Sequence, residues 1–411
     1  MRLLIISQYF WPESFRINAI VQSLVEKGIE VDVLTGVPNY PAGDVFDGYK
    51  ASKIRTESWK GAKIFRVPLI PRGNARSWRL AANYFSFIFS GSLFGPWLLR
   101  DRRYDAIFVY GLSPILSSIP AIFISKIKRK PLIIWVQDLW PESLSATGHV
   151  KSPLILRIVE KVVSWIYRQA HLLLVQSRAF KRPIASLAPD KIIEYYPNSV
   201  DPTFAKPVLS DQELPEIPAL DEGFSILFAG NIGAAQSMDM IIETAEQLKY
   251  IPQIKFVIIG SGSKLEWMRN EVDKRNLENV TLPGWLPPST MPGLMQKASA
   301  LIVSLTNEPI FALTVPNKIQ AYLAAARPII ASLNGEGAKL VEDAGAGFSV
   351  TAEDAHGLKD AILMLYNMPA EQRSHFGING RKYFLKHFDH EKLVEKLIEK
   401  IETTIRKQEI D

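Results

Sequence analysis

The sequence predicts an α/β protein made of two Rossmann-like, doubly wound domains that face each other across a cleft. Short apolar, β-branched runs of strand length alternate with segments of helix length along most of the chain. This alternation is typical of parallel sheets covered by helices. Residues 201–222 interrupt it with four prolines and several acidic side chains, a composition that favours a linker. We therefore predict an N-terminal domain over residues 1–200 and a C-terminal domain over residues 223–387.

The predicted elements follow this division. Strands are expected in the N-terminal domain at 3–7, 31–35, 106–110, 132–137 and 172–176, with helices at 18–27 and 155–168. Strands are expected in the C-terminal domain at 225–229, 256–260, 280–282, 300–304 and 329–332, with helices at 238–248 and 264–275. Residues 388–411 predict a separate amphipathic helix, because Leu393, Leu397 and Ile401 share one face. This helix either packs as a terminal element or crosses back to the N-terminal domain.

Composition and charge restrict the classes of function. The chain has 411 residues, of which 47% are hydrophobic and 22% charged, as in folded soluble proteins. It has no cysteine, which excludes disulfides, thiolate metal sites and a cysteine nucleophile. Residues 1–200 hold 27 Lys and Arg against 14 Asp and Glu. A basic half suits an anionic membrane surface, a phosphorylated substrate or nucleic acid, although a solvated surface is the simpler reading. Nucleic-acid binding is not expected, because no reader motif accompanies the basic half.

An apolar stretch, Leu80–Leu99, contains no charged residue and is followed by Arg100. Its length permits a membrane span, but its serines, glycines and proline weaken that interpretation. Its aromatic residues and flanking arginines are typical of a helix that lies in a membrane interface. Three alternatives therefore stay open: an interfacial helix, a core helix or hairpin, and a true span.

Candidate site residues of the N-terminal domain lie where predicted strands end, because doubly wound domains bind ligands there. After the first strand come Glu13, Arg16 and Asn18, and after the second come Asn39 and Tyr40. The fourth strand leads to Asp138, Trp140 and Glu142. Carboxylates near aromatic rings can have raised pKa values and serve as acids or bases. Helix capping is the alternative role for Asp138.

Candidate site residues of the C-terminal domain lie mainly in glycine-rich turns and at one helix start. Glycine turns let a phosphate or a flat base approach the backbone. These turns contain Gly230, Asn231, Gly233, Gln236, Gly260, Gly262, Gly284 and Trp285. Lys318 lies in the first turn of a predicted helix, where free N–H groups and the helix dipole attract phosphate. No spacing of metal ligands occurs, so no catalytic metal and no cofactor are expected.

Seven ordered segments resemble family 4 glycosyltransferases, which have the GT-B architecture. AGNIGAAQSMD, IIGSGSKLEWM, PGWLPPSTMPGLMQKASALIVSL and TVPNKIQAYLAAARPIIASLNGEGAKLV resemble their nucleotide-sugar half. YFWPESFRIN, LTGVPNYPAG and WVQDLWPES resemble the acceptor half of the WbuB-like branch, the transferases of L-fucosamine or N-acetyl-L-fucosamine. The resemblance implies a retaining, metal-independent enzyme that uses a UDP-sugar. It also implies an undecaprenyl-diphosphate-linked acceptor in O-antigen or capsule synthesis, at the cytoplasmic face of the membrane.

The resemblance also assigns roles to residues. Lys318 would offset charge on the departing UDP, and Glu308 would bind the sugar ring. Asp138 and Glu13 would orient the acceptor hydroxyl, and Arg16 would bind a phosphate. The remaining donor contacts would come from Phe311, Leu313, Thr314, Asn317 and Gln320.

The chain departs from the family pattern at several of these positions. Gln137 stands before Asp138 where the family usually has His, and Ala321 stands where it usually has a glutamate. The family's charged residues after the glycine-rich strand are also missing. Two alternatives are a UDP-sugar 2-epimerase of the same architecture and a non-catalytic, sugar-binding subunit of an assembly complex.

Overall fold

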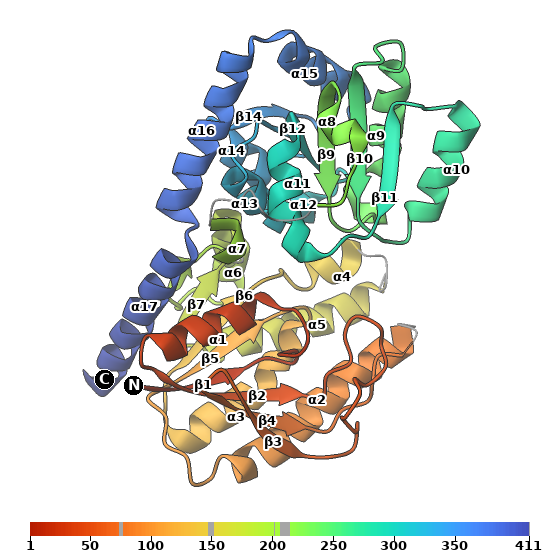
Figure 1. The fold of residues 1–411 in the computed structure, drawn as a ribbon. Coiled ribbons are helices and arrows are strands. Elements are labelled where there is room, and N and C mark those ends of the chain that lie inside the picture. The colour runs from red at the N-terminus through yellow and green to blue at the C-terminus, as the bar shows by residue number, and fades with distance from the viewer. Residues whose placement is uncertain (74–76, 147–151, 201, 206–213, 411) are drawn as a thin grey trace. The chain divides into compact units, whose positions relative to one another are not determined.

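The computed structural model describes residues 1–73, 77–146, 152–200, 202–205 and 214–410. The chain separates into two compact units (Figure 1). The first contains residues 1–197 together with 391–411, and the second contains residues 198–390.

The first unit is built on an eight-stranded sheet in the order β3-β4-β2-β1-β5-β6-β7-β8. Its strands are β1 (Arg2–Ile6), β2 (Glu30–Gly36), β3 (Arg55–Trp59), β4 (Ala62–Val67), β5 (Ala106–Gly111), β6 (Leu132–Val136), β7 (Leu172–Val175) and β8 (Ile193–Tyr195). All neighbours are parallel except β3 and β4, which form an antiparallel edge pair. The strand order reverses between β1 and β5, so the carboxyl ends of these strands are the expected ligand edge.

Helices cover both faces of this sheet. Helix α1 (Arg16–Glu26) shares a core with α17 (His390–Ile410), which contributes Leu393, Leu397 and Ile401. Helices α2 (Ser77–Leu98), α3 (Ile119–Lys128) and α5 (Pro153–Gln169) belong to the other face, where Gly95 of α2 packs against Leu34 of β2. The last helix is therefore a structural part of the first unit.

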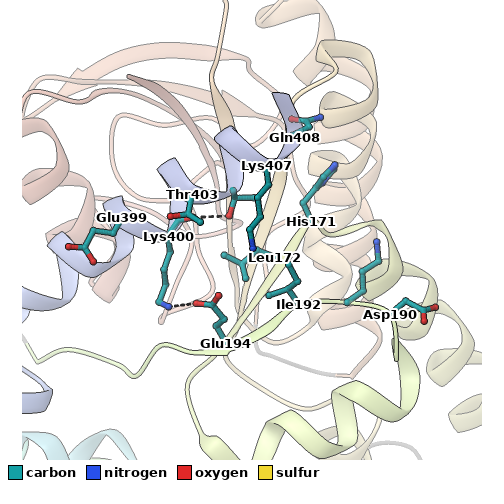
Figure 2. Close-up of a pocket in the computed structure, with 12 residues that line it drawn as sticks. His171, Leu172, Asp190, Ile192, Glu194, Glu399, Lys400, Thr403, Lys407 and Gln408 are labelled. Atoms are coloured by element: carbon teal, nitrogen blue, oxygen red, sulfur yellow. Dashed lines mark hydrogen bonds and ion pairs between the residues drawn. The ribbon is translucent and has the colours of Figure 1, made fainter. Parts of the chain in front are cut away.

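Helix α17 also borders a pocket of about 510 Å³ against the starts of β7 and β8 (Figure 2). Lys400 of α17 forms an ion pair with Glu194 of β8 there. His171 accepts a hydrogen bond from the backbone N–H of Leu132, which leaves its proton on Nε2 when the ring is neutral. The pocket lies away from the carboxyl edge of the sheet, so it is separate from the expected ligand edge.

The second unit has a six-stranded, all-parallel sheet in the order β11-β10-β9-β12-β13-β14. Its strands are β9 (Phe224–Ala229), β10 (Ile254–Ile259), β11 (Val280–Gly284), β12 (Ala300–Ser304), β13 (Ile329–Ser332) and β14 (Gly347–Val350). Its main helices are α9 (Met238–Gln247), α10 (Leu265–Arg275), α11 (Met291–Lys297), α13 (Asn317–Ala324), α14 (Glu336–Asp343), α15 (Ala355–Asn367) and α16 (Ala370–His387). Here the strand order reverses between β9 and β12, which brings the β9 turn and the segment after β12 to one edge.

The linker predicted over residues 201–222 is in part a packed segment. Residues 201 and 206–213 lie outside the described residues. Residues 202–205 form α7 and 218–221 form α8, while Ile217 and Leu220 are buried in the core of the second unit. Along the chain, the four prolines lie between the two sheets, as the sequence indicated. The apolar side chains of Ile217 and Leu220 nevertheless pack into the core of the second unit.

The apolar stretch at Leu80–Leu99 is a single helix, α2, and not a hairpin. Phe87 is fully buried, whereas Phe85 and Phe89 are exposed. No helix among the described residues is both long enough and apolar enough to span a membrane.

Candidate active site

The most unusual side chain of the second unit is Lys318, in the first turn of α13. Its Nζ is buried and has no hydrogen-bond partner in the described part of the chain. It lies 3.5 Å from the centroid of the Phe228 ring on β9. Burial lowers the pKa of Lys318 to about 7. An ammonium held on an aromatic face without an anion is ready to pair with one.

The turn after β9 lies directly against this amine. Gly230 has φ +138°, and a Cβ placed there would come within 2.6 Å of Lys318 Cε. Glycine is therefore needed both for the backbone conformation and for the approach of the lysine. Any group that binds over the Gly230 backbone would also meet the Lys318 side chain.

A pocket of about 340 Å³ begins at this turn. Gly230, Asn231, Gly260 and Ser261 form its polar wall. Its apolar wall consists of Ala229, Ile259, Trp285, Leu286, Pro288, Met291 and Met295. The indole of Trp285 is 64% exposed, so a flat aromatic ligand can stack on it.

Three further glycines hold the turns of this edge together. The backbone N–H of Gly230 donates to Ile259 O at 2.9 Å, and that of Gly260 donates to Gly284 O at 2.8 Å. A Cβ on Gly260 would overlap the carbonyl oxygen of Gly230, and one on Gly262 would overlap that of Ile232. The glycines that the sequence suggested as room for a base are here needed for backbone packed on backbone.

We expect Gly260→Ala to lower the free energy of unfolding by about 3 kcal/mol, because a methyl group collides with a carbonyl at φ +149°. Gly284→Ala is the matched control, since its Cβ would have open space and only φ +84° opposes it. We expect that variant to lose about 1 kcal/mol. Urea unfolding followed by tryptophan fluorescence measures both. Equal losses would show that the close approach at Gly260 is unimportant.

Hydrogen bonds to the Gln236 side chain hold the rest of the first glycine turn in shape. Gln236 Oε1 accepts hydrogen bonds from Asn231 Nδ2 at 3.2 Å and from Gly233 N at 3.1 Å. Its carbonyl accepts a hydrogen bond from Ser304 Oγ at 2.7 Å. Both oxygens of Gln236 therefore shape the turn, and its contact with the donor sugar nucleotide stays a prediction.

Several other residues that were predicted to contact the donor sugar nucleotide form hydrogen bonds within the protein. The N–H of Phe311 donates to Glu308 O and that of Thr314 donates to Phe311 O, so neither is open to a phosphate. The Thr314 hydroxyl donates to Ile310 O at 2.9 Å. Leu313 ends α12 (Pro309–Leu313), and the exposed Glu308 precedes it without reaching the pocket.

Two residues of α13 that were predicted to contact the donor sugar nucleotide also form hydrogen bonds within the protein. The Gln320 side chain is buried, and in the amide orientation that suits its neighbours, with O and N exchanged, its nitrogen donates to the carbonyls of Pro316 and Asn317 at 3.1 Å each. Asn317 Oδ1 accepts a hydrogen bond from Asn198 Nδ2 at 2.9 Å. Of the predicted residues on α13, only Lys318 lies against the glycine turn.

In the first unit, Glu13 organises the loops at the carboxyl edge of the sheet. Its Oε1 accepts hydrogen bonds from the backbone N–H groups of Asn39 and Tyr40, both at 2.8 Å. Its Oε2 accepts one from Phe10 N at 3.1 Å, and the side chain is 1% exposed. Burial raises the pKa of Glu13 to about 7, against the opposing effect of these donors. The role of Glu13 in orienting an acceptor hydroxyl stays a prediction; in the structure its oxygens accept hydrogen bonds from its own loops.

We expect Glu13→Gln to lower the free energy of unfolding by about 2 kcal/mol, because an amide NH₂ would face a backbone N–H. The wild-type pKa of Glu13 is raised from 4.5 in the folded state. The folded protein therefore binds more protons than the unfolded chain between about pH 4.5 and 7, and this group's contribution to stability falls as pH rises there. The variant should lack that dependence. Glu142→Gln, at an exposed carboxylate, is the control; destabilisation of both variants alike would contradict the role of Glu13.

Asn18 and Asn39 brace the same loops and are not free for an acceptor. Asn18 Oδ1 accepts a hydrogen bond from Trp11 N at 3.1 Å, while its Nδ2 donates to Glu13 O at 2.7 Å. Asn39 is fully buried and its Nδ2 donates to Val37 O at 2.9 Å. Tyr40 instead presents an aromatic ring, half-buried, with the Arg72 guanidinium 5.0 Å from its centroid.

Asp138 is the other titratable carboxylate at this edge. It is half-buried after β6, and burial raises its pKa to about 6 against a hydrogen bond with Ser113. Ser113 Oγ also accepts a hydrogen bond from Trp140 Nε1 at 2.9 Å. Arg16 forms a hydrogen bond with Tyr110 of β5. The negative charge of Asp138 contributes to raising the pKa of Tyr110, after the larger effect of burial. The structure thus brings Asp138, Arg16 and Trp140 to one place, while Glu142 is exposed at the start of α4 (Glu142–Ala146).

Sequence reasoning missed three partners. Ser113 and Tyr110 connect the predicted residues of the first unit, and Phe228 supports Lys318 in the second. Ser113 and Tyr110 lie at the end of a predicted strand, a position that could have marked them. Nothing in the sequence marks Phe228 as anything but a core residue.

Both parts of the chain match known glycosyltransferase domains. Residues 14–198 match the glycosyl transferase 4-like domain, and residues 223–368 match the glycosyl transferases group 1 domain. A colanic acid biosynthesis glycosyl transferase, WcaI of Escherichia coli K12, is 23% identical over 74% of this chain and 76% of its own. An uncharacterized glycosyltransferase of Methanocaldococcus jannaschii, MJ1178, is 29% identical over 41% of this chain and 45% of its own.

Solved structures share the whole fold. Sucrose-phosphate synthase of Thermosynechococcus elongatus matches with a TM-score of 0.74 and 16% identity, over 98% of both chains. Anabaena HepE in complex with UDP and glucose matches with a TM-score of 0.68 and 15% identity, over 98% of this chain and 99% of its own. Two parallel α/β units with these matches define a GT-B fold. The chain carries a glycosyl transferase 4-like domain and a glycosyl transferases group 1 domain, and it is a glycosyltransferase.

Proposed function

We propose that the second unit binds a UDP-sugar, with the diphosphate between the Gly230 turn and Lys318. The observation that carries this proposal is the buried Lys318 amine, which has no hydrogen-bond partner among the described residues and lies against a glycine turn. The uracil would enter the 340 Å³ pocket and stack on Trp285. HepE in complex with UDP and glucose, and an Escherichia coli trehalose-6-phosphate structure bound with UDP-2-fluoro glucose, support a uridine donor.

In the proposed reaction the bond between the sugar and the diphosphate breaks as the acceptor oxygen attacks. Lys318, which takes up a proton from solution when it pairs with the diphosphate, would stabilise charge on the departing UDP without a metal ion. We further propose that configuration is retained, as the family resemblance implies, with no protein nucleophile. Asp138 would accept a hydrogen bond from the acceptor hydroxyl and take its proton as the new bond to the sugar forms, and Arg16 would bind a phosphate of the acceptor.

The acceptor and the sugar are proposed from sequence similarity. We propose a lipid-linked saccharide acceptor, met at the membrane surface, and N-acetyl-L-fucosamine as the transferred sugar. The similarity to a colanic acid biosynthesis glycosyl transferase supports a place in surface polysaccharide synthesis. The basic first half and the exposed aromatic residues of α2 support contact with lipid.

We expect purified enzyme in EDTA to release UDP from one of a panel of UDP-, GDP- and dTDP-sugars only when membrane extract supplies an acceptor. Released nucleotide is the readout. UDP release without extract would favour the epimerase-type alternative. Restoration of activity by added Mg²⁺ alone would contradict the metal-independent role of Lys318.

A further inference from the structure

Exposed apolar side chains gather on three helices of the first unit. Of the 21 large hydrophobic side chains that are exposed among the described residues, eleven lie on α2, α3 and α5. They are Trp78, Phe85, Phe89, Leu93, Trp97, Phe123, Ile127, Leu154, Ile155, Ile158 and Trp165. Such a concentration marks an interaction surface, because isolated apolar residues scatter on ordinary surfaces.

Helix α2 shows that these side chains are not needed for packing. Phe85, Phe89, Leu93 and Trp97 recur every four residues and are 55–70% exposed. The opposite side of the helix is anchored by small residues, since a Cβ on Gly91 would lie 2.9 Å from Pro120. The helix therefore packs closely through one face and presents an aromatic stripe on the other.

Helix α3 joins α2 to α5 on the same face of the sheet. It contacts both helices, and it carries exposed Phe123 and Ile127 of its own. The Lys128 amine donates to the carbonyls of Leu99, Arg100 and Arg102 at 2.7–2.9 Å, which fixes the end of α2. The three helices (Figure 1) thus form one firmly connected surface.

The charge of this surface identifies its partner. Residues 77–103, 119–130 and 152–169 hold eleven Lys and Arg but only two carboxylates, Asp101 and Glu160. Guanidinium groups of Arg79 and Arg100 lie 5.3 and 5.8 Å from the rings of Trp78 and Trp97, at the two ends of the stripe. Aromatic side chains with paired arginines suit the boundary between anionic headgroups and acyl chains. A protein partner is less favoured, because lysine is depleted in protein interfaces and four of these eleven basic residues are lysines.

We propose that α2, α3 and α5 form a docking surface for an anionic lipid bilayer, with the α2 stripe in the interface and the basic residues on headgroups. This inference names the surface for the lipid contact of the proposed function and rests on it. It also explains why the outward side of α2 carries aromatic and apolar side chains. In the membrane-bound protein, lipid and not water would surround that side.

The test is co-sedimentation of the full chain with vesicles of phosphatidylcholine, with and without about one-third phosphatidylglycerol. Wild type should bind the anionic vesicles. Phe85→Ser/Phe89→Ser should lower that binding about tenfold or more, by loss of buried aromatic area. Arg100→Ala/Arg103→Ala should lower the preference for anionic vesicles, in proportion to the lost charges. Tyr250→Ser, at a 70% exposed aromatic residue of the second unit, should change nothing.

Two outcomes would overturn the proposal. One is wild-type protein that stays in the supernatant with anionic vesicles, or aromatic and basic variants that bind as wild type does. The other is a dimer in sedimentation equilibrium that the Phe85/Phe89 variant dissociates, which would make this a protein interface. UDP binding in solution should be unchanged in every variant of this surface. If wild-type protein binds vesicles but does not bind UDP, the proposed donor site is refuted and the docking surface is not.

Discussion

Replacing Lys318 by methionine is expected to lower sugar transfer about 10²–10³-fold while leaving the fold intact. Methionine keeps the apolar contact with the Phe228 ring but cannot offset charge on the departing diphosphate. It also removes a buried amine that has no partner among the described residues, so thermal stability should stay equal or rise. Turnover and thermal midpoint, measured on one preparation, separate this role from a structural one.

Lys297→Met is the matched control for the Lys318 variant. Lys297 is also on a helix of the second unit, but it is exposed and pairs with Asp221 at 3.0 Å. Its substitution should leave transfer within about twofold of wild type, since exposed ion pairs contribute little. Wild-type turnover in the Lys318 variant, or equal loss in both variants, would contradict the proposed site.

Asp138→Asn should give the second largest loss of transfer, about 10²-fold, because the amide cannot accept the acceptor's proton in the same way. The raised pKa of Asp138, about 6, predicts a pH signature. The carboxylate is the form that binds a hydroxyl proton, so wild-type turnover should rise as pH increases through 6. The variant should lack this rise. A pH–rate profile under saturating donor measures it.

Glu142→Asn tests whether any carboxylate after β6 behaves like Asp138. Glu142 is exposed and only four residues further along the chain. Its loss should affect neither turnover nor the pH profile. A rise through pH 6 that persists in Asp138→Asn would assign the titration to another group and remove Asp138 from the mechanism.

The sequence predicted the architecture well because its signals were local. Buried strands such as Leu132–Val136 are continuous apolar runs, and a parallel sheet covered on both faces requires such runs. Edge strands carried weaker signals. Strand β3, with the sequence RTESW, reads as a polar loop because its side chains are partly exposed and only its pairing with β4 makes it a strand.

The site was predicted less well because polar residues in loops serve two purposes that look alike in sequence. Glu13, Asn18, Asn39 and Gln320 lie where ligand contacts were expected, but each satisfies buried backbone groups instead. Loops at a sheet edge expose many such groups, and these must be paired. Only three-dimensional contacts distinguish a brace from a ligand contact. Lys318 stays a candidate because a cation at a helix start has no backbone N–H to satisfy.

Lys318 and the Gly230 turn are proposed to bind the diphosphate of UDP without a metal. The most direct test of this proposal is calorimetry of UDP binding in EDTA at pH 8, in two buffers of different ionisation enthalpy. Because the pKa of Lys318 in the free protein is lowered to about 7, the amine is mostly neutral at pH 8 and must gain a proton to pair with the diphosphate. We predict uptake of about one proton on binding, an affinity that falls about tenfold per pH unit above 7, and neither effect in Lys318→Met. Equal UDP affinity in wild type and variant, or binding without proton uptake, would contradict the account.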